Sequence, residues 1–230
     1  ALVSTAIGCL IGFVVGVVQT IPVDKKRDSA AKRGLLRVVK IILKAYVELF
    51  RGTPMIVQAV FIYYGLSQVF NIQLGMWSAA SLVVSINTGA YMAESVRGGI
   101  ISIDKGQFEG AMSIGMTHSQ TMFKVIIPQV MRNILPSVSN EFVINIKDTS
   151  VLNVIGVTEL YYFAGIIKRQ SFETFQTYLV VCVLYFILTF TVTRLLRFVE
   201  RKLDGNDSYV IFGSQSDSAA EIRIKTAREG

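Results

Sequence analysis

The sequence predicts an all-α integral membrane protein built as a five-span helical bundle. Only 17% of its 230 residues are charged, its mean hydropathy is +0.51, and several long stretches carry no charge at all. Soluble domains contain about 25% charged residues. The composition therefore argues against a disordered chain, a disulfide scaffold and an ordinary soluble globule.

The spans follow from the apolar stretches, since a helix needs about 20 mostly apolar residues to cross a bilayer. The longest charge-free stretch, 52–93, has room for two spans divided by the polar loop Ser67–Gly75. A weaker stretch is counted as a span although it contains Lys147 and Asp148. The five expected spans are 1–23, 52–66 (extended by Lys40–Phe50), 77–96, 139–158 and 174–193.

The distribution of lysine and arginine predicts which loops face the cytoplasm. Residues 24–44 hold eight basic and two acidic residues, and 194–202 hold four basic and one acidic residue, whereas the loop 67–76 has no basic residue. We expect the N-terminus outside and the C-terminus inside. The net charge of +7 is thus a pair of basic patches at the membrane edge rather than a surface for nucleic acid.

The two ends of the chain also suggest boundaries. The first span begins at Ala1 without a methionine, so we expect its start to be truncated. Residues 1–203 are expected to form the transmembrane domain, and the polar residues 204–230 a cytoplasmic tail.

Small residues line one face of the first span. Gly8, Gly12 and Gly16 recur every four residues, with Ser4 one step earlier. This spacing permits close contact between helices. The expected use is packing inside the bundle, and the alternative is contact with a second copy.

Proline interrupts the helical pattern at Arg51–Pro54. Proline cannot donate a hydrogen bond to the preceding turn. The segment is therefore either the start of a span or a kink that turns Arg51 and Gln58 toward a cavity.

Lys147 and Asp148 are the most informative charges, because a charge inside a span faces the bundle interior or a water-filled path. Neighbouring helix residues point about 100° apart, so each needs its own partner; Glu94 and Glu141 are the candidates for Lys147. A zwitterionic ligand or a structural polar network would each explain the segment. The remaining candidates for the substrate pathway are the polar residues Asn87, Thr88, Thr149 and Ser150.

The polar segment 97–138 is expected to stay inside and contains small residues beside an acidic one: Glu109, Gly110, Ala111 and Gly115. A docking helix and an amphipathic helix on the membrane are the two interpretations. The sequence contains no catalytic motif that we recognise and no pattern of metal ligands, so no catalytic or metal site is expected.

The polar segment 97–138 also contains a pattern that resembles a known protein family. The pattern from Glu109 to Pro128 (Glu109-Gly110-Ala111, Gly115, then Val125-x-Ile127-Pro128) resembles the EAA loop of permease subunits in bacterial ABC importers, expected over about 104–134. Gly110, Val125 and Ile127 depart conservatively from the usual residues. Further stretches at 48–54, 87–94 and 140–150 resemble the polar amino acid branch, and the likeness covers about 1–203.

The resemblance implies a type I importer permease: a non-catalytic subunit that moves a polar amino acid, glutamine or a relative, across the bacterial cytoplasmic membrane by alternating access. It implies two ATP-binding ABC subunits docked on coupling helices, a second identical or related permease subunit and an extracytoplasmic substrate-binding protein. ATP and Mg²⁺ would bind the ATPase, with no cofactor on this chain. Permeases for basic or acidic amino acids, and an ATP-independent channel or carrier, are the alternatives.

Overall fold

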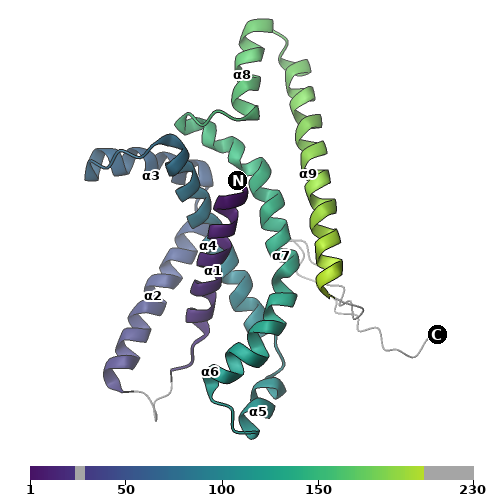
Figure 1. Ribbon diagram of the computed structural model, residues 1–230. Coiled ribbons are helices and arrows are strands. Elements are labelled where there is room, and N and C mark those ends of the chain that lie inside the picture. Colours follow the sequence, from purple (N-terminus) through teal and green to yellow (C-terminus); the bar gives the residue numbers. More distant parts are fainter. Residues whose placement is uncertain (24–28, 205–230) are drawn as a thin grey trace, which may run out of the picture.

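The computed structural model describes residues 1–23 and 29–204 of the chain (Figure 1). Its regular elements are all helical over these residues, which confirms the predicted all-α class. A π-helical turn, Met122–Ile126, leads into α7, and a 3-10 turn, Thr149–Ile155, follows it. The α-helices are α1 (Leu2–Thr20), α2 (Ala30–Gly52), α3 (Met55–Phe70), α4 (Met76–Ile101), α5 (Lys105–Ser113), α6 (His118–Thr121), α7 (Ile127–Asp148), α8 (Leu160–Ser171) and α9 (Thr174–Asp204).

Helix α4 is the centre of the bundle. It contacts α1, α2, α3 and α7, and its buried side chains contribute to each of the hydrophobic clusters. Its polar residues are covered as well: Thr88 is fully buried, and Ser85 donates a hydrogen bond to the Ser4 carbonyl over 3.0 Å. A helix of this polarity can lie in a membrane because its neighbours, rather than lipid, surround its polar groups.

The glycines of α1 form a close contact with α4. A Cβ atom built on Gly12 would lie 2.4 Å from the Met92 Cβ, and one on Gly8 would lie 2.6 Å from the Thr88 Cβ. A Cβ on Gly16 would lie 2.7 Å from the Ala93 carbonyl oxygen. The predicted small-residue face is therefore used inside the chain, against α4, where it allows the two backbones to approach closely.

By length and apolarity two single helices, α1 and α9, can cross a membrane, and two bent helix pairs add up to two more spans. The bent pairs are α2 with α3, at 115°, and the segment 118–155 with α8, at 59°. Helix α4 is less apolar, but its 26 residues are about 39 Å long and could cross the hydrocarbon core. With α4 included, and each bent pair counted once, five spans result.

Three predicted boundaries are wrong. Residues 40–66 do not form one continuous helix, because the helix breaks after Gly52 and turns sharply. Much of 24–44 belongs to α2 rather than to a loop, and the expected span 139–158 is displaced, because α7 starts at Ile127 and ends at Asp148. The break after Gly52 follows from Pro54, whereas α2 and α7 have polar faces that hide them from a hydropathy window. The tail 205–230 lies outside the described residues.

The elements expected on one side of the membrane lie at one end of the molecule. In Figure 1 the start of α2 and the short helices α5 and α6 lie at the bottom, and α9 runs from α8 at the top down toward that end, whereas α3 lies higher. This grouping matches the separation of loops that the basic residues predict.

Replacing Gly12 with alanine tests the α1–α4 contact. Alanine raises helix propensity by about 1 kcal/mol, yet its Cβ would clash with the backbone and Cβ of α4. We therefore expect Gly12→Ala to lower the thermal unfolding temperature in detergent. Gly65→Ala in α3, where no atom lies within 4 Å of the added Cβ, is the control. An unchanged or higher unfolding temperature for Gly12→Ala would contradict the close contact.

Candidate functional site

The break between α2 and α3 is held by one glutamine side chain. Pro54 has no N–H, so the Phe50 carbonyl four residues earlier loses its helical donor. The Gln58 amide replaces it, donating from Nε2 to the Phe50 and Thr53 carbonyl oxygens at 2.9 Å each. Asn87 on α4 donates in turn to the Gln58 Oε1 over 2.9 Å. The break is thus fastened to the central helix.

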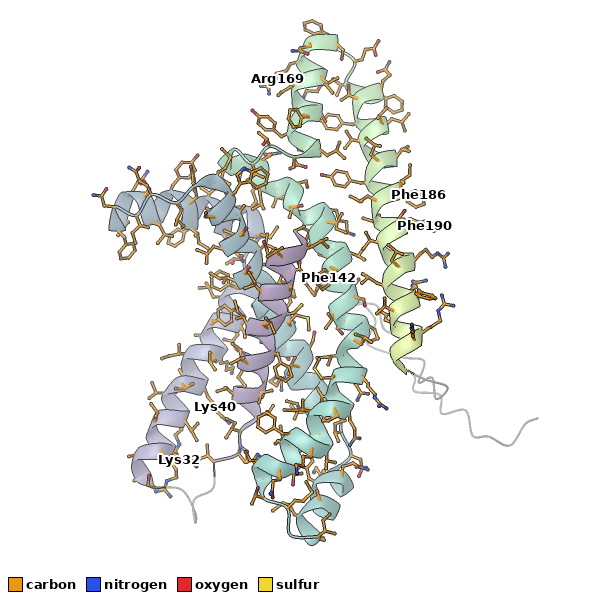
Figure 2. The ribbon with its side chains drawn as sticks, in the orientation of Figure 1. Lys32, Lys40, Phe142, Arg169, Phe186 and Phe190 are labelled. Atoms are coloured by element: carbon orange, nitrogen blue, oxygen red, sulfur yellow. The ribbon has the colours of Figure 1, made fainter. Side chains whose placement is uncertain are left out.

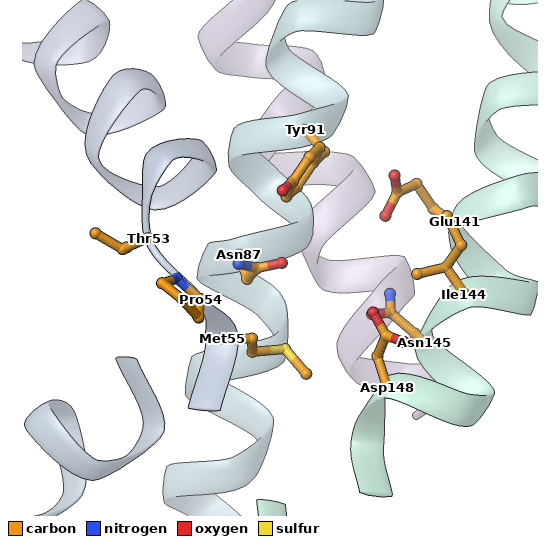
Figure 3. A pocket seen from close by; sticks show the side chains of 9 residues that line it. All are labelled: Thr53, Pro54, Met55, Asn87, Tyr91, Glu141, Ile144, Asn145 and Asp148. Atoms are coloured by element: carbon orange, nitrogen blue, oxygen red, sulfur yellow. The ribbon is translucent and has the colours of Figure 1, made fainter. Parts of the chain in front are cut away.

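A cavity of about 210 Å³ opens beside this break (Figure 3). Its walls are the α2–α3 break, α4 and α7. The side chains of α7 face those of the break and of α4 across the opening. The lining residues are Thr53, Pro54, Met55, Asn87, Tyr91, Glu141, Ile144, Asn145 and Asp148.

The α7 wall carries two carboxyl groups. Glu141, Asn145 and Asp148 follow one another at intervals of four and three residues, so they share one helix face. Glu141 is only 6% exposed. Neither it nor Asp148 forms a hydrogen bond or an ion pair with any residue that the structure describes. The cavity therefore presents acidic groups that have no cationic partner in this part of the chain.

Asn145 secures the position of that wall. Its amide nitrogen donates to the Thr5 hydroxyl over 2.9 Å and to the Thr88 hydroxyl over 2.8 Å. All three residues are buried. One side chain thereby joins α7 to both α1 and α4.

Two of the pathway residues expected from the sequence, Asn87 and Asp148, line the cavity. Gln58 and Thr88 lie behind its walls, where both are buried and hydrogen-bonded. Thr149 donates to the Ile146 carbonyl over 3.1 Å and begins the 3-10 turn that also contains Ser150. The structure thus assigns several of these side chains hydrogen bonds within the fold.

Arg51 and Glu94 lie beside the cavity without lining it. Arg51 lies 3.9 Å from a Glu94 carboxyl oxygen and 5.7 Å from the centre of the Tyr91 ring. Glu94 also pairs with Arg97 one turn further along α4. This charged cluster links the end of α2 to α4.

Lys147 does not share the cavity with Asp148. It lines a separate groove beside α9 and forms no ion pair with a described residue, so neither Glu94 nor Glu141 is its partner. The difference follows from helix geometry, since successive residues point about 100° apart.

Sequence reasoning did not place Tyr91, Glu141 and Asn145 at the cavity. The spacing of Asn87 and Tyr91, and of Glu141 and Asn145, could have indicated it, because residues four apart lie on the same side of a helix.

The residues of the EAA-like pattern lie on and after α5. Glu109 and Gly110 are exposed, whereas Ala111 is buried against the bundle. Gly115 ends the turn after α5 with φ of +85°, a conformation that favours glycine. Pro128 is the second residue of α7 and comes directly after the π-helical turn Met122–Ile126. Glu109 therefore projects from a short helix at one end of the molecule.

The chain matches a family model described as the inner membrane component of binding-protein-dependent transport systems, over residues 29–205. The "Probable amino-acid ABC transporter permease protein PatM" of Vibrio harveyi is 40% identical over 76% of this chain and 78% of its own length. The glutamine transport system permease protein GlnP of Escherichia coli (strain K12) is 38% identical over 69% of this chain and 73% of its own. The L-cystine permease protein TcyB of Bacillus subtilis (strain 168) is 34% identical over 85% and 81%.

Solved structures of ABC transporters are similar to this chain as well. The crystal structure of an amino acid ABC transporter with histidines has 35% sequence identity, covers 86% of each chain and superimposes with a TM-score of 0.74. An inward-facing methionine transporter, MetNI, with 21% identity and a TM-score of 0.63, shares the fold.

Gln58→Met should loosen the break between α2 and α3. Methionine keeps the length of the side chain but cannot donate to the half-buried Phe50 and Thr53 carbonyls, so Thr53 loses this side-chain donor and Phe50 keeps only the longer bond of 3.4 Å from Asn87. The expected loss is about 1–3 kcal/mol of stability, measured as a lower unfolding temperature in detergent. Gln68→Met, at an exposed position on the same helix, should change little. Equal behaviour of the two variants would argue against the capping role.

Proposed function

We propose that this chain, which belongs to the family of binding-protein-dependent transport system inner membrane components, is the membrane-spanning subunit of an ATP-driven importer. The importer moves a polar amino acid by alternating access. The chain performs no catalysis itself, because ATP hydrolysis takes place in a separate subunit.

The observation that carries the substrate class is the pair of carboxyl groups at the cavity. Every amino acid substrate has an α-ammonium group, and a carboxylate without a partner inside a membrane bundle is a costly group that favours a cation. Asn87 and Asn145 add amide groups that can bind a polar ligand. We assign Asn87, Glu141, Asn145 and Asp148 to substrate contact.

Glutamine or a related amino acid is the proposed substrate. Relatives named for glutamine, cystine and arginine transport are all similar to this chain. The two carboxyl groups also suit a basic amino acid, which is the second candidate. They disfavour an acidic substrate because like charges repel. An ATP-independent channel would leave the exposed docking residues of α5 unexplained.

The proposed assembly places two such permeases, identical or related, together with two ATP-binding subunits and an extracytoplasmic substrate-binding protein. ATP and Mg²⁺ belong to the ATPase. The coupling segment consists of Glu109, Gly110, Ala111, Gly115 and Pro128, of which all but the buried Ala111 are exposed for docking. In the proposed orientation the end of the molecule with α5 faces the cytoplasm, the N-terminus lies outside and the C-terminus inside.

Uptake into vesicles tests the substrate proposal. Uptake by the permease, reconstituted with its ATPase and binding protein, would be measured for a panel of neutral, basic and acidic amino acids. Glutamine should be imported in preference to the others, and only when ATP is present. Asp148→Asn should weaken apparent affinity by about 10- to 150-fold, because it removes a charged contact worth about 1.5–3 kcal/mol. Glu173→Gln, exposed beyond α8, is the control. Robust uptake by the permease alone would refute the importer function, and unchanged affinity in Asp148→Asn would make that residue structural.

Glu109→Lys tests the coupling segment. Reversing the charge of an exposed side chain on α5 should weaken assembly with the ATPase and abolish substrate-stimulated ATP hydrolysis, while the permease itself stays folded. Glu173→Lys makes the same charge change at the opposite end of the molecule (Figure 1) and should leave ATPase stimulation intact. Normal coupling in Glu109→Lys would remove α5 as the docking site.

A further inference from the structure

A second opening lies between α7 and α9, away from the cavity described above. It is a groove of about 280 Å³, and its lining includes Phe186 and Phe190 of α9, which are labelled in Figure 2. Along α9 the lining is aromatic at Phe186 and Phe190 and basic at Arg194 and Arg197. The lining residues are Val143, Lys147, Phe186, Thr189, Phe190, Thr193, Arg194 and Arg197.

The groove carries positive charge without a matching carboxylate. Three of its lining residues are basic, Lys147, Arg194 and Arg197, and none is acidic. Over the described part of the chain, these three form no ion pair; Arg194 lies 5.0 Å from the centre of the Phe190 ring instead. An unpaired cation in or beside a membrane span is costly, so an anion is the expected partner.

The hydroxyl groups of the groove are already used. Thr189 donates to the Tyr185 carbonyl over 2.8 Å, and Thr193 donates to the Thr189 carbonyl over 2.6 Å. The donors that remain for a ligand are therefore the ammonium and guanidinium groups, and guanidinium groups suit phosphate oxygens in particular.

The groove opens toward the surroundings of the bundle. Helix α9 packs mainly against α7 and α8, and only 6% of its apolar span is buried inside the chain. From Phe186 to Arg197 the helix rises about 16 Å, roughly half of the 30 Å hydrocarbon core. The groove thus extends over the depth of one leaflet, with its arginines at the end nearer to Arg201 and Lys202, where α9 leaves the apolar region.

We propose that this groove binds an anionic phospholipid in the cytoplasmic leaflet, with Arg194 and Arg197 at the phosphate and an acyl chain beside Phe186 and Phe190. Lys147, on α7, adds a third positive charge to the lining. A free phosphate ion would satisfy the arginines but leave the aromatic part of the groove empty, whereas a lipid fills both. Basic pockets between spans on the cytoplasmic side are suited to anionic headgroups. The inference rests on the membrane location and orientation of the proposed function but not on its substrate.

Lipid retention by the purified complex tests the proposal. The permease and its ATPase would be delipidated in detergent, titrated with phosphatidylglycerol or phosphatidylcholine, and examined by native mass spectrometry. We expect specific retention of phosphatidylglycerol. The double variant Arg194→Gln/Arg197→Gln should lose about thirtyfold in apparent affinity, since each basic group contributes roughly fivefold.

The double variant Arg201→Gln/Lys202→Gln is the matched control, because it removes the same charge from the same end of α9 outside the groove. Arg194→Lys/Arg197→Lys keeps the charge and should retain much of the binding, which separates lipid loss from misfolding. Equal loss in the control, equal retention of phosphatidylcholine, or the same thermal stabilisation by inorganic phosphate alone would each overturn the lipid site. Amino acid uptake, measured separately, would report on the proposed function in either case.

Discussion

The bundle depends on covering one polar helix on every side. Helix α4 carries hydroxyl, amide and charged groups through the middle of the molecule, where lipid could not satisfy them. The glycines of α1 allow that helix to approach the α4 backbone, and the hydrogen bonds that Asn145 donates to Thr5 and Thr88 bring α7 to the same place. Because α4 is held by α1 and α7, it can offer its remaining polar face, with Asn87 and Tyr91, to the cavity.

The helix break at Pro54 is the second requirement for the cavity. Proline removes a backbone donor and so leaves carbonyl groups without their helical partners. The break can form a stable wall of the cavity only if these carbonyl groups find other donors. Gln58 provides them, and Asn87 links Gln58 to α4. The same two side chains therefore stabilise the break and place Thr53, Pro54 and Met55 at the cavity.

The two faces of α7 have different surroundings. One face presents Glu141 and Asp148 to the cavity, and the other presents Lys147 to the groove beside α9. Acidic and basic groups that are neighbours in sequence are thus separated by the helix between two openings. The acidic opening favours a cationic group of a substrate, and the basic opening favours an anionic group of a lipid.

The sequence alone determined the helical class, the alternation of membrane-edge charge, the small-residue face of α1 and the motif at Glu109, since composition, periodicity and local spacing carry this information. The tertiary structure decided which polar residues share a site. Sequence reasoning grouped Lys147 with Asp148 and left Asn145 aside, whereas packing places Asn145 between α1 and α4 and turns Lys147 toward α9. The limits of α7 and the sharp turn after Gly52 also needed the structure. The physical reason is the same in each case: a polar residue inside a bundle is positioned by partners distant in sequence, and hydropathy does not record them.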